Sequence, residues 1–125
     1  AVPGVRICAR RSCAAGRTLL GALFESLATL SVRVFGQAAE ATVSYLRTRG
    51  GEREVDIIVE GDGLRVLGIG VKLGRTVSDA DVRHLPWLRR QIGDALLDAM
   101  VLTTGGEAYR RADGIAVVPL ALMGP

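Results

Sequence analysis

The chain has 125 residues, 49% of them hydrophobic, and a formal net charge of +3. A chain of this length and composition buries its core as one domain, so no internal linker is expected. The small net charge permits contact with phosphate but does not demand a nucleic-acid partner. Fifteen arginines stand against a single lysine, Lys72. With the abundant Ala, Val and Gly, this usage indicates a GC-rich bacterial genome rather than a DNA-binding stripe.

Residues 1–16 form an arginine-rich leader without periodicity, which we expect to be irregular. Cys8 and Cys13 lie in it, and a zinc site would need two further ligands, whereas the rest of the chain offers only His84. We therefore expect a structural or incidental role for the two cysteines. The leader lacks the apolar core of a signal peptide, and no apolar run reaches the roughly 20 residues that span a bilayer. The sequence thus predicts a soluble, cytoplasmic protein.

The first predicted element is a helix from Thr18, its N-cap, to about Phe35. Apolar residues recur in it at spacings of three and four, which is typical of a helix with one buried stripe. The expected stripe comprises Leu20, Leu23, Phe24, Leu27, Leu30 and Val34. Glu25 lies off this stripe, among small neighbours.

The rest of residues 17–125 continues as a single α/β domain. Val, Ile and Leu are frequent at 41–47, 54–60 and 64–73, and glycine turns at Gly50-Gly51 and around Gly63 separate these runs, which predicts three strands in two hairpins. A second helix should run from Ser78 or Asp79 to about Gln91, kinked or limited by Pro86. Further strands are expected at 97–103 and 115–120. This order predicts a mixed sheet flanked by helices.

Three residues of the predicted second hairpin suggest chemistry. Asp56 is followed after fourteen residues by Gly70 and after sixteen by Lys72. If the hairpin turns about Gly63, positions 56 and 70 lie opposite each other, and alternation of side chains places Gly70 and Lys72 on one face. The same alternation should put Asp56 on one face of its strand together with Glu54 and Glu60. A surface salt bridge between Asp56 and Lys72 is the plainer explanation of this spacing.

The spacing also matches a PD-(D/E)XK nuclease site, in which two carboxylates hold Mg²⁺ and the lysine orients water or stabilises the phosphorane. Here glycine replaces the second acid. The chain resembles more specifically the C-terminal domain of undefined function that follows an AAA-type ATP-binding domain in many bacterial ATPases and is itself similar to PD-(D/E)XK nucleases. The resemblance covers about residues 17–125 and rests on four segments: Gly21-Ala-Leu-Phe-Glu25-Ser26, Tyr45-Leu-Arg-Thr-Arg49, Arg53-Glu-Val-Asp56-Ile-Ile-Val-Glu60 and Gly68-Ile-Gly-Val-Lys72.

This resemblance implies a restriction-endonuclease-like fold and a site at Glu25, Asp56, Gly70 and Lys72. Three of those four positions match, and the glycine at position 70 removes a ligand. No P-loop is present, because Lys72, the only lysine, is flanked by Val71 and Leu73. Mg²⁺ or Mn²⁺ would be the cofactor only if the site is functional.

Three functions remain open from the sequence. The first is a catalytically impaired nuclease-like accessory domain that contacts nucleic acid or an AAA-type ATPase partner. The second is an active Mg²⁺-dependent nuclease in which Glu54 or Glu60 replaces the missing carboxylate, and the third is a self-association module that forms a homodimer. Arg83, Arg89 and Arg90 on the second helix are the candidate phosphate contacts. On the same helix, His84 is expected to be partly buried and hydrogen-bonded. Trp87 is expected to anchor the helix on the sheet.

Overall fold

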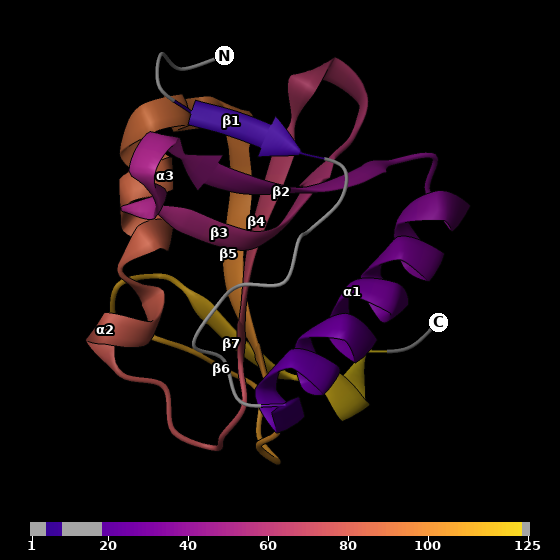
Figure 1. The fold of residues 1–125 in the computed structure, drawn as a ribbon, viewed down its shortest axis with the longest axis vertical. Coiled ribbons are helices and arrows are strands. Elements are labelled where there is room, and N and C mark those ends of the chain that lie inside the picture. The colour runs from indigo at the N-terminus through magenta and orange to yellow at the C-terminus, as the bar shows by residue number, and fades with distance from the viewer. Residues whose placement is uncertain (1–4, 9–18, 124–125) are drawn as a thin grey trace.

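The computed structural model describes residues 5–8 and 19–123, which form a mixed sheet with helices on both faces (Figure 1). Its seven strands lie in the order β1-β2-β3-β4-β5-β7-β6. The α/β fold class predicted from the sequence is confirmed. The helices and strands, in chain order, are β1 (Val5–Cys8), α1 (Leu19–Ala38), β2 (Thr42–Thr48), β3 (Glu54–Glu60), β4 (Val66–Lys72), α2 (Asp79–Val82), α3 (His84–Ile92), β5 (Leu96–Thr103), β6 (Tyr109–Arg110) and β7 (Ala116–Pro119).

The centre of the sheet follows the predicted hairpins. β2 pairs antiparallel with β3, and β3 pairs antiparallel with β4, while β4 pairs parallel with β5 and β5 with β7. Gly50 at φ 86° and Gly63 at φ 70° adopt the left-handed conformation that these two turns need. The strand bounds differ from the predicted ones by two residues or fewer over β2, β3, β4 and β5.

Two strands were not predicted. β1 lies in the arginine-rich leader and pairs antiparallel with β2, with Val5 opposite Thr48. It was missed because four residues are too few to show a period of two. The two-residue strand β6 lies at the other edge of the sheet, against β7. The predicted N-cap Thr18 and Cys13 lie outside the described residues.

The buried face of α1 is the reverse of the predicted one. The side chains that face the sheet are small or polar, namely Glu25, Ala28, Val32 and Gly36. Ala28 and Val32 pack against Ile57, Ile69 and Leu102 in one hydrophobic layer. The predicted stripe was wrong for Leu20, Leu23, Leu27, Leu30 and Val34, which are 53–64% exposed. Small residues occupy this face because they let the helix axis approach the sheet closely. At Gly36 the approach is so close that an added Cβ would lie 2.9 Å from Val43 Cγ2.

By length and composition alone, α1 also resembles a membrane-crossing helix. Its 20 residues include an 18-residue window with a mean hydropathy of 1.4, of which 22% is buried in the fold. The contact of Ala28 and Val32 with the sheet means that one side of this helix is already covered by protein.

The second predicted helix is divided in two. α2 ends at Val82 and α3 begins at His84, and Pro86 is the third residue of α3. Proline is tolerated there because the first turn of a helix has no internal acceptor for its N–H groups. Leu85 and Leu88 of α3 pack with Val101 and Val117 in the second hydrophobic layer, on the sheet face opposite α1.

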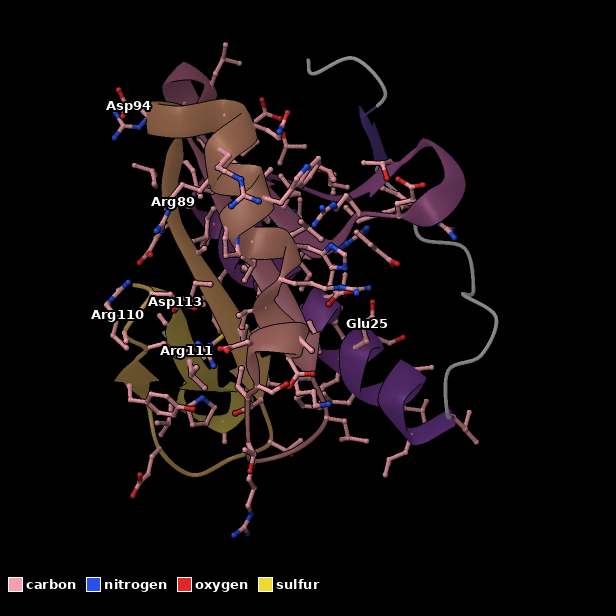
Figure 2. All side chains as sticks on the ribbon, turned by 90° about the vertical axis from the view of Figure 1, so that its left-hand side faces the viewer. Glu25, Arg89, Asp94, Arg110, Arg111 and Asp113 are labelled. Carbon is pink, nitrogen blue, oxygen red and sulfur yellow. The ribbon has the colours of Figure 1, made fainter. Side chains whose placement is uncertain are left out.

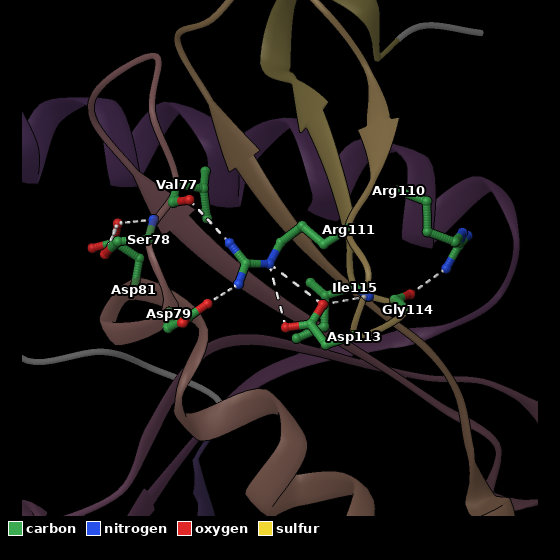
Figure 3. Close-up of polar contacts among 9 residues, drawn as sticks. All are labelled: Val77, Ser78, Asp79, Asp81, Arg110, Arg111, Asp113, Gly114 and Ile115. Atoms are coloured by element: carbon green, nitrogen blue, oxygen red, sulfur yellow. Dashed lines mark hydrogen bonds and ion pairs between the residues drawn. The ribbon is translucent and has the colours of Figure 1, made fainter.

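Arg111 connects α2 with the loop between β6 and β7 (Figure 3). Its guanidinium donates hydrogen bonds to the Val77 carbonyl at 2.9 Å, to Asp79 and to Asp113 at 3.3 Å. The Arg111 side chain is 15% exposed, so its bond to the Val77 carbonyl is largely shielded from water, whereas Asp79 is 99% exposed. Arg110, the preceding residue, instead forms an exposed pair with Asp98 at 3.0 Å.

We therefore expect Arg111→Met to lower the free energy of unfolding by about 1–3 kcal/mol, because the shielded Val77 carbonyl loses a charged donor. Arg110→Met is the matched control and should change stability much less, since its ion pair is exposed. Urea unfolding followed by circular dichroism measures both. Equal effects of the two substitutions would contradict the assigned role of Arg111.

Candidate functional site

Asp56 and Gly70 lie at the end of the β3–β4 ladder, with the predicted register. Ile57 pairs with Ile69 and Ile58 with Gly68, so the next position along the ladder sets Asp56 opposite Gly70. The backbone N–H of Val71 donates to Asp56 Oδ2 at 2.8 Å. The carboxylate therefore binds the β4 backbone directly beside the position where the second acid of a nuclease site would stand.

A β-bulge changes the faces of the acids on β3. Ser44 of β2 pairs with Ile58 and Leu46 pairs with Val55, which leaves two residues of β3 opposite one of β2. Val55 and Ile58 consequently pack in the same hydrophobic layer, although strict alternation would put them on opposite faces. The prediction that Glu54 and Glu60 share one face was wrong for this reason. Glu60 is also four residues from Asp56, about 13 Å along a strand.

Lys72 and Gly70 share the face of β4 that α2 and α3 cover. A Cβ on Gly70 would lie 3.6 Å from Val101 Cγ2 and 4.0 Å from Leu85 Cδ1, which are both in that layer. Lys72 Nζ lies 3.1 Å from Asp81 Oδ1, a carboxylate supplied by α2. The acid that pairs with the lysine is thus Asp81 rather than the predicted Asp56.

Asp81 is held by several donors. Its Oδ2 accepts hydrogen bonds from the Ser78 N–H at 2.8 Å and the Ser78 hydroxyl at 3.0 Å. Burial raises the pKa of Asp81, but these bonds and the Lys72 ammonium outweigh it and bring the pKa below its ordinary value. The Ser78-x-x-Asp81 spacing is that of a capping box, a sequence signal that would have found this residue.

Glu25 is 7% exposed and lies on the sheet-facing side of α1. Figure 2 places it on one side of the molecule, with Arg89, Arg110 and Arg111 on the other. α1 covers the sheet face opposite the one that Gly70 and Lys72 share, so the structure places Glu25 on the other side of the sheet from these two residues. Among residues 5–8 and 19–123, no group of three or more His, Cys, Asp or Glu side chains is placed to hold a metal ion.

Cationic and aromatic side chains gather near Asp56. The Arg53 guanidinium lies over the Trp87 ring, 5.7 Å from its centroid. Arg83 Nε lies 3.3 Å from His84 Nε2. Trp87 packs against the second hydrophobic layer, between α3 and the sheet, as predicted. Arg53, which had no signal in the sequence, thus joins Arg83 at this end of the sheet.

Arg89, another predicted phosphate contact, points elsewhere. The Arg89 guanidinium approaches the β6–β7 loop, where a Cβ on Gly114 would lie 3.6 Å from its Nη1. Arg89 also lowers the pKa of Asp98, whose largest influence is the hydrogen bond from Arg110. Arg89 and Arg90 are exposed residues of the last turn of α3. The charges of Arg83 and Asp56 both act on His84, so Arg83 lies in the region of Asp56, whereas Arg89 does not.

The environment of His84 lowers its pKa. Burial lowers its pKa below the ordinary value of 6.5, and the charges of Arg83 and Arg53 lower it further, against a smaller opposite effect of Asp56. Within the described part of the chain, the buried Nδ1 of His84 has no hydrogen-bond partner. The neutral imidazole is therefore the form that the fold favours.

A family model described as "Domain of unknown function (DUF4143)" matches residues 20–123, which is most of the chain. No curated protein matches the sequence.

The lowered pKa of His84 predicts how stability depends on pH. The unfolded chain binds the proton of His84 more tightly than the folded chain does. The contribution of His84 to the free energy of unfolding should therefore be fully present above pH 6.5, and it should be lost as the pH falls from there through the folded-state pKa. His84→Gln should flatten this decrease. Urea unfolding of both proteins at pH 7.5 and 5.5, with an NMR titration of the imidazole, tests this; a folded-state pKa above 6.5 would refute it.

Proposed function

The chain belongs to the DUF4143 family of domains of unknown function, and within it we propose a catalytically impaired PD-(D/E)XK-like domain that serves as an accessory or interaction module. The observation that carries this proposal is how the residues of the nuclease-like frame (Asp56, Gly70 and Lys72) are used. Asp56 binds the backbone of β4, Lys72 pairs with Asp81, and Gly70 supplies no side-chain oxygen.

The described residues do not fit a Mg²⁺ site. A site of this class needs carboxylate oxygens from neighbouring strands to balance the charge of the ion. Gly70 contributes none, and Asp81, the acid nearest to Lys72, is already bonded to Ser78 and Lys72. The proposed function therefore includes no hydrolytic step.

The alternative, an active nuclease with a migrated carboxylate, receives less support from the geometry. Glu60 lies about 13 Å along β3 from Asp56, beyond the reach of one metal ion. Glu54 is closer, but its neighbour Val55 packs in the same layer as Leu85 and Val101, which a Cβ on Gly70 would contact. Alternation of side chains therefore turns Glu54 toward the other face of the sheet from Gly70. Neither glutamate replaces the lost acid at position 70 in the way that the alternative requires.

Two partner classes follow from this function. Two arginines, Arg53 and Arg83, lie near Asp56, and the Trp87 ring lies beneath Arg53. Arginine side chains bind phosphate groups, and an aromatic ring can stack on a base. These groups support nucleic acid as the partner of this end of the sheet. An AAA-type ATPase is the partner that the sequence resemblance implies, and no P-loop of this chain supplies that activity.

The decisive experiment restores the missing acid. Gly70→Glu should bind Mn²⁺ more tightly than the wild type in calorimetry, since the new carboxylate faces Asp56 across the hairpin and lies two residues from Lys72. The added Cβ meets Val101 and Leu85 at ordinary contact distances, so the domain should stay folded. The wild type should bind Mn²⁺ weakly and should not cleave single- or double-stranded DNA.

Two controls separate charge from shape. Gly70→Gln adds a side chain of the same size without the charge, and Gly70→Glu with Asp56→Ala removes the opposing ligand; both should bind as weakly as the wild type. Metal-dependent DNA cleavage by the wild type that Asp56→Ala abolishes would overturn the proposal and establish an active nuclease. Equal, negligible binding by all the folded proteins would show that positions 56 and 70 do not form a metal site.

A further inference from the structure

The exposed face of α1 has the spacing of a coiled-coil seam. Leu20, Leu23, Leu27, Leu30 and Val34 follow one another at intervals of three, four, three and four residues, and each is at least 53% exposed. This interval pattern is that of the a and d positions of a heptad, where each side chain inserts between residues of a facing helix. The sheet-facing residues Glu25 and Val32 fall on the opposite side of the same helix.

We infer that this leucine seam (Leu20, Leu23, Leu27, Leu30 and Val34) is the interface with a second copy of the chain, formed by two antiparallel α1 helices. Antiparallel pairing about a twofold axis at the middle of α1 brings Leu23 opposite Val34 of the second copy, and Leu27 opposite Leu30. Four aliphatic residues of each chain thereby meet aliphatic residues, which makes the seam self-complementary as an isologous interface requires.

The charges of α1 favour this orientation. The helix has no acidic residue in its first turn and no basic residue in its last turn, so no side chain there offsets its macrodipole. An antiparallel second copy places the positive end of each helix beside the negative end of the other. Glu25, on the sheet side, and Arg33 are the only charged residues of α1, so few charges oppose the contact.

The apolar surface of the seam runs along most of α1. The seam and the adjacent Leu19, which is 77% exposed, supply a continuous apolar surface along a helix of about 30 Å. An apolar surface of this extent on one helix marks an interaction site rather than scattered exposed residues.

Other occupants fit the seam less well. Residues 9–18, which join β1 to α1, contain three arginines and no large aliphatic residue, so their composition supplies no apolar partner. A bilayer would have to surround a helix whose other side packs on the sheet through Ala28 and Val32, which are 0% and 4% exposed. A second copy covers the seam and leaves that packing intact.

The test is the molecular mass of the full 125-residue chain by light scattering and sedimentation over a range of concentrations. The wild type should be a dimer. Leu23→Glu and Leu27→Glu should each weaken the dimer on the order of 100-fold, because each buries a charge in an apolar seam. Circular dichroism should be unchanged, since both side chains are exposed in the monomer. Leu97→Glu is the matched control, as Leu97 is 57% exposed like Leu23 but lies on β5, and it should remain a dimer.

Cross-linking tests the orientation in a background with Cys8→Ser and Cys13→Ser. A mixture of Leu27→Cys and Leu30→Cys chains should form a disulfide-linked heterodimer, whereas neither variant alone should cross-link efficiently. Efficient cross-linking of Leu27→Cys to itself would refute the antiparallel seam. A wild type that stays monomeric, or glutamate variants that stay dimeric, would overturn the inference altogether. A monomeric chain that also co-sediments with phosphatidylcholine and phosphatidylglycerol vesicles would assign the seam to a membrane surface.

Discussion

The hydrogen bond from the Val71 N–H to Asp56 determines what the end of the central hairpin can do. It joins β3 to β4 just beyond their last ladder pair, at the position where the bulge in β3 interrupts regular pairing with β2. A carboxylate held in this way has a structural use whether or not it binds a metal. Gly70 and Lys72 then occupy the neighbouring positions on β4, where α2 supplies Asp81 as the partner of the lysine. Asp56 and Lys72 are thus both used within the fold, through the Val71 N–H and the Asp81 carboxylate.

Helix α1 presents two faces with different uses. Its small residues allow close packing on Ile57 and Ile69, and this contact turns the large aliphatic residues toward solvent. An exposed leucine seam lowers the solubility of a monomer. A second helix that covers the seam would remove this apolar surface from water. If the seam forms a dimer, two copies of the Asp56 region, with its Arg53 and Trp87, are carried on one assembly. A dimer that presents two such regions would bind a long polyanion more tightly than one copy does.

The strands β2, β3 and β4 and the register of the β3–β4 hairpin were predictable because local signals specify them. Glycines at positive φ mark both turns, and the turn at Gly63 sets Asp56 opposite Gly70. The buried face of α1 was not predictable, because leucines at intervals of three and four are equally compatible with a core stripe and with an exposed seam. Only the shape of the sheet surface, which accepts Ala28 and Val32, distinguishes the two.

The parts of the site that the sequence did not predict depend on contacts distant in the chain. The bulge at Asp56 and Ile57 arises from the pairing of β3 with β2, and it shifted the faces of Glu54 and Glu60. The approach of Asp81 to Lys72 depends on how α2 docks against the end of β4. Arg53 became a neighbour of Trp87 only when α3 packed across the sheet.

The stability of Asp56→Ala with and without Mg²⁺ tests the central claim most directly, since that claim gives Asp56 a structural use. Loss of the acceptor of the Val71 N–H should lower the free energy of unfolding by about 1–3 kcal/mol, and Mg²⁺ should change the wild-type value little. Catalytic carboxylates behave differently, because their removal often leaves stability unchanged or raises it. An Asp56→Ala protein at least as stable as the wild type, together with clear stabilisation of the wild type by Mg²⁺, would contradict the account.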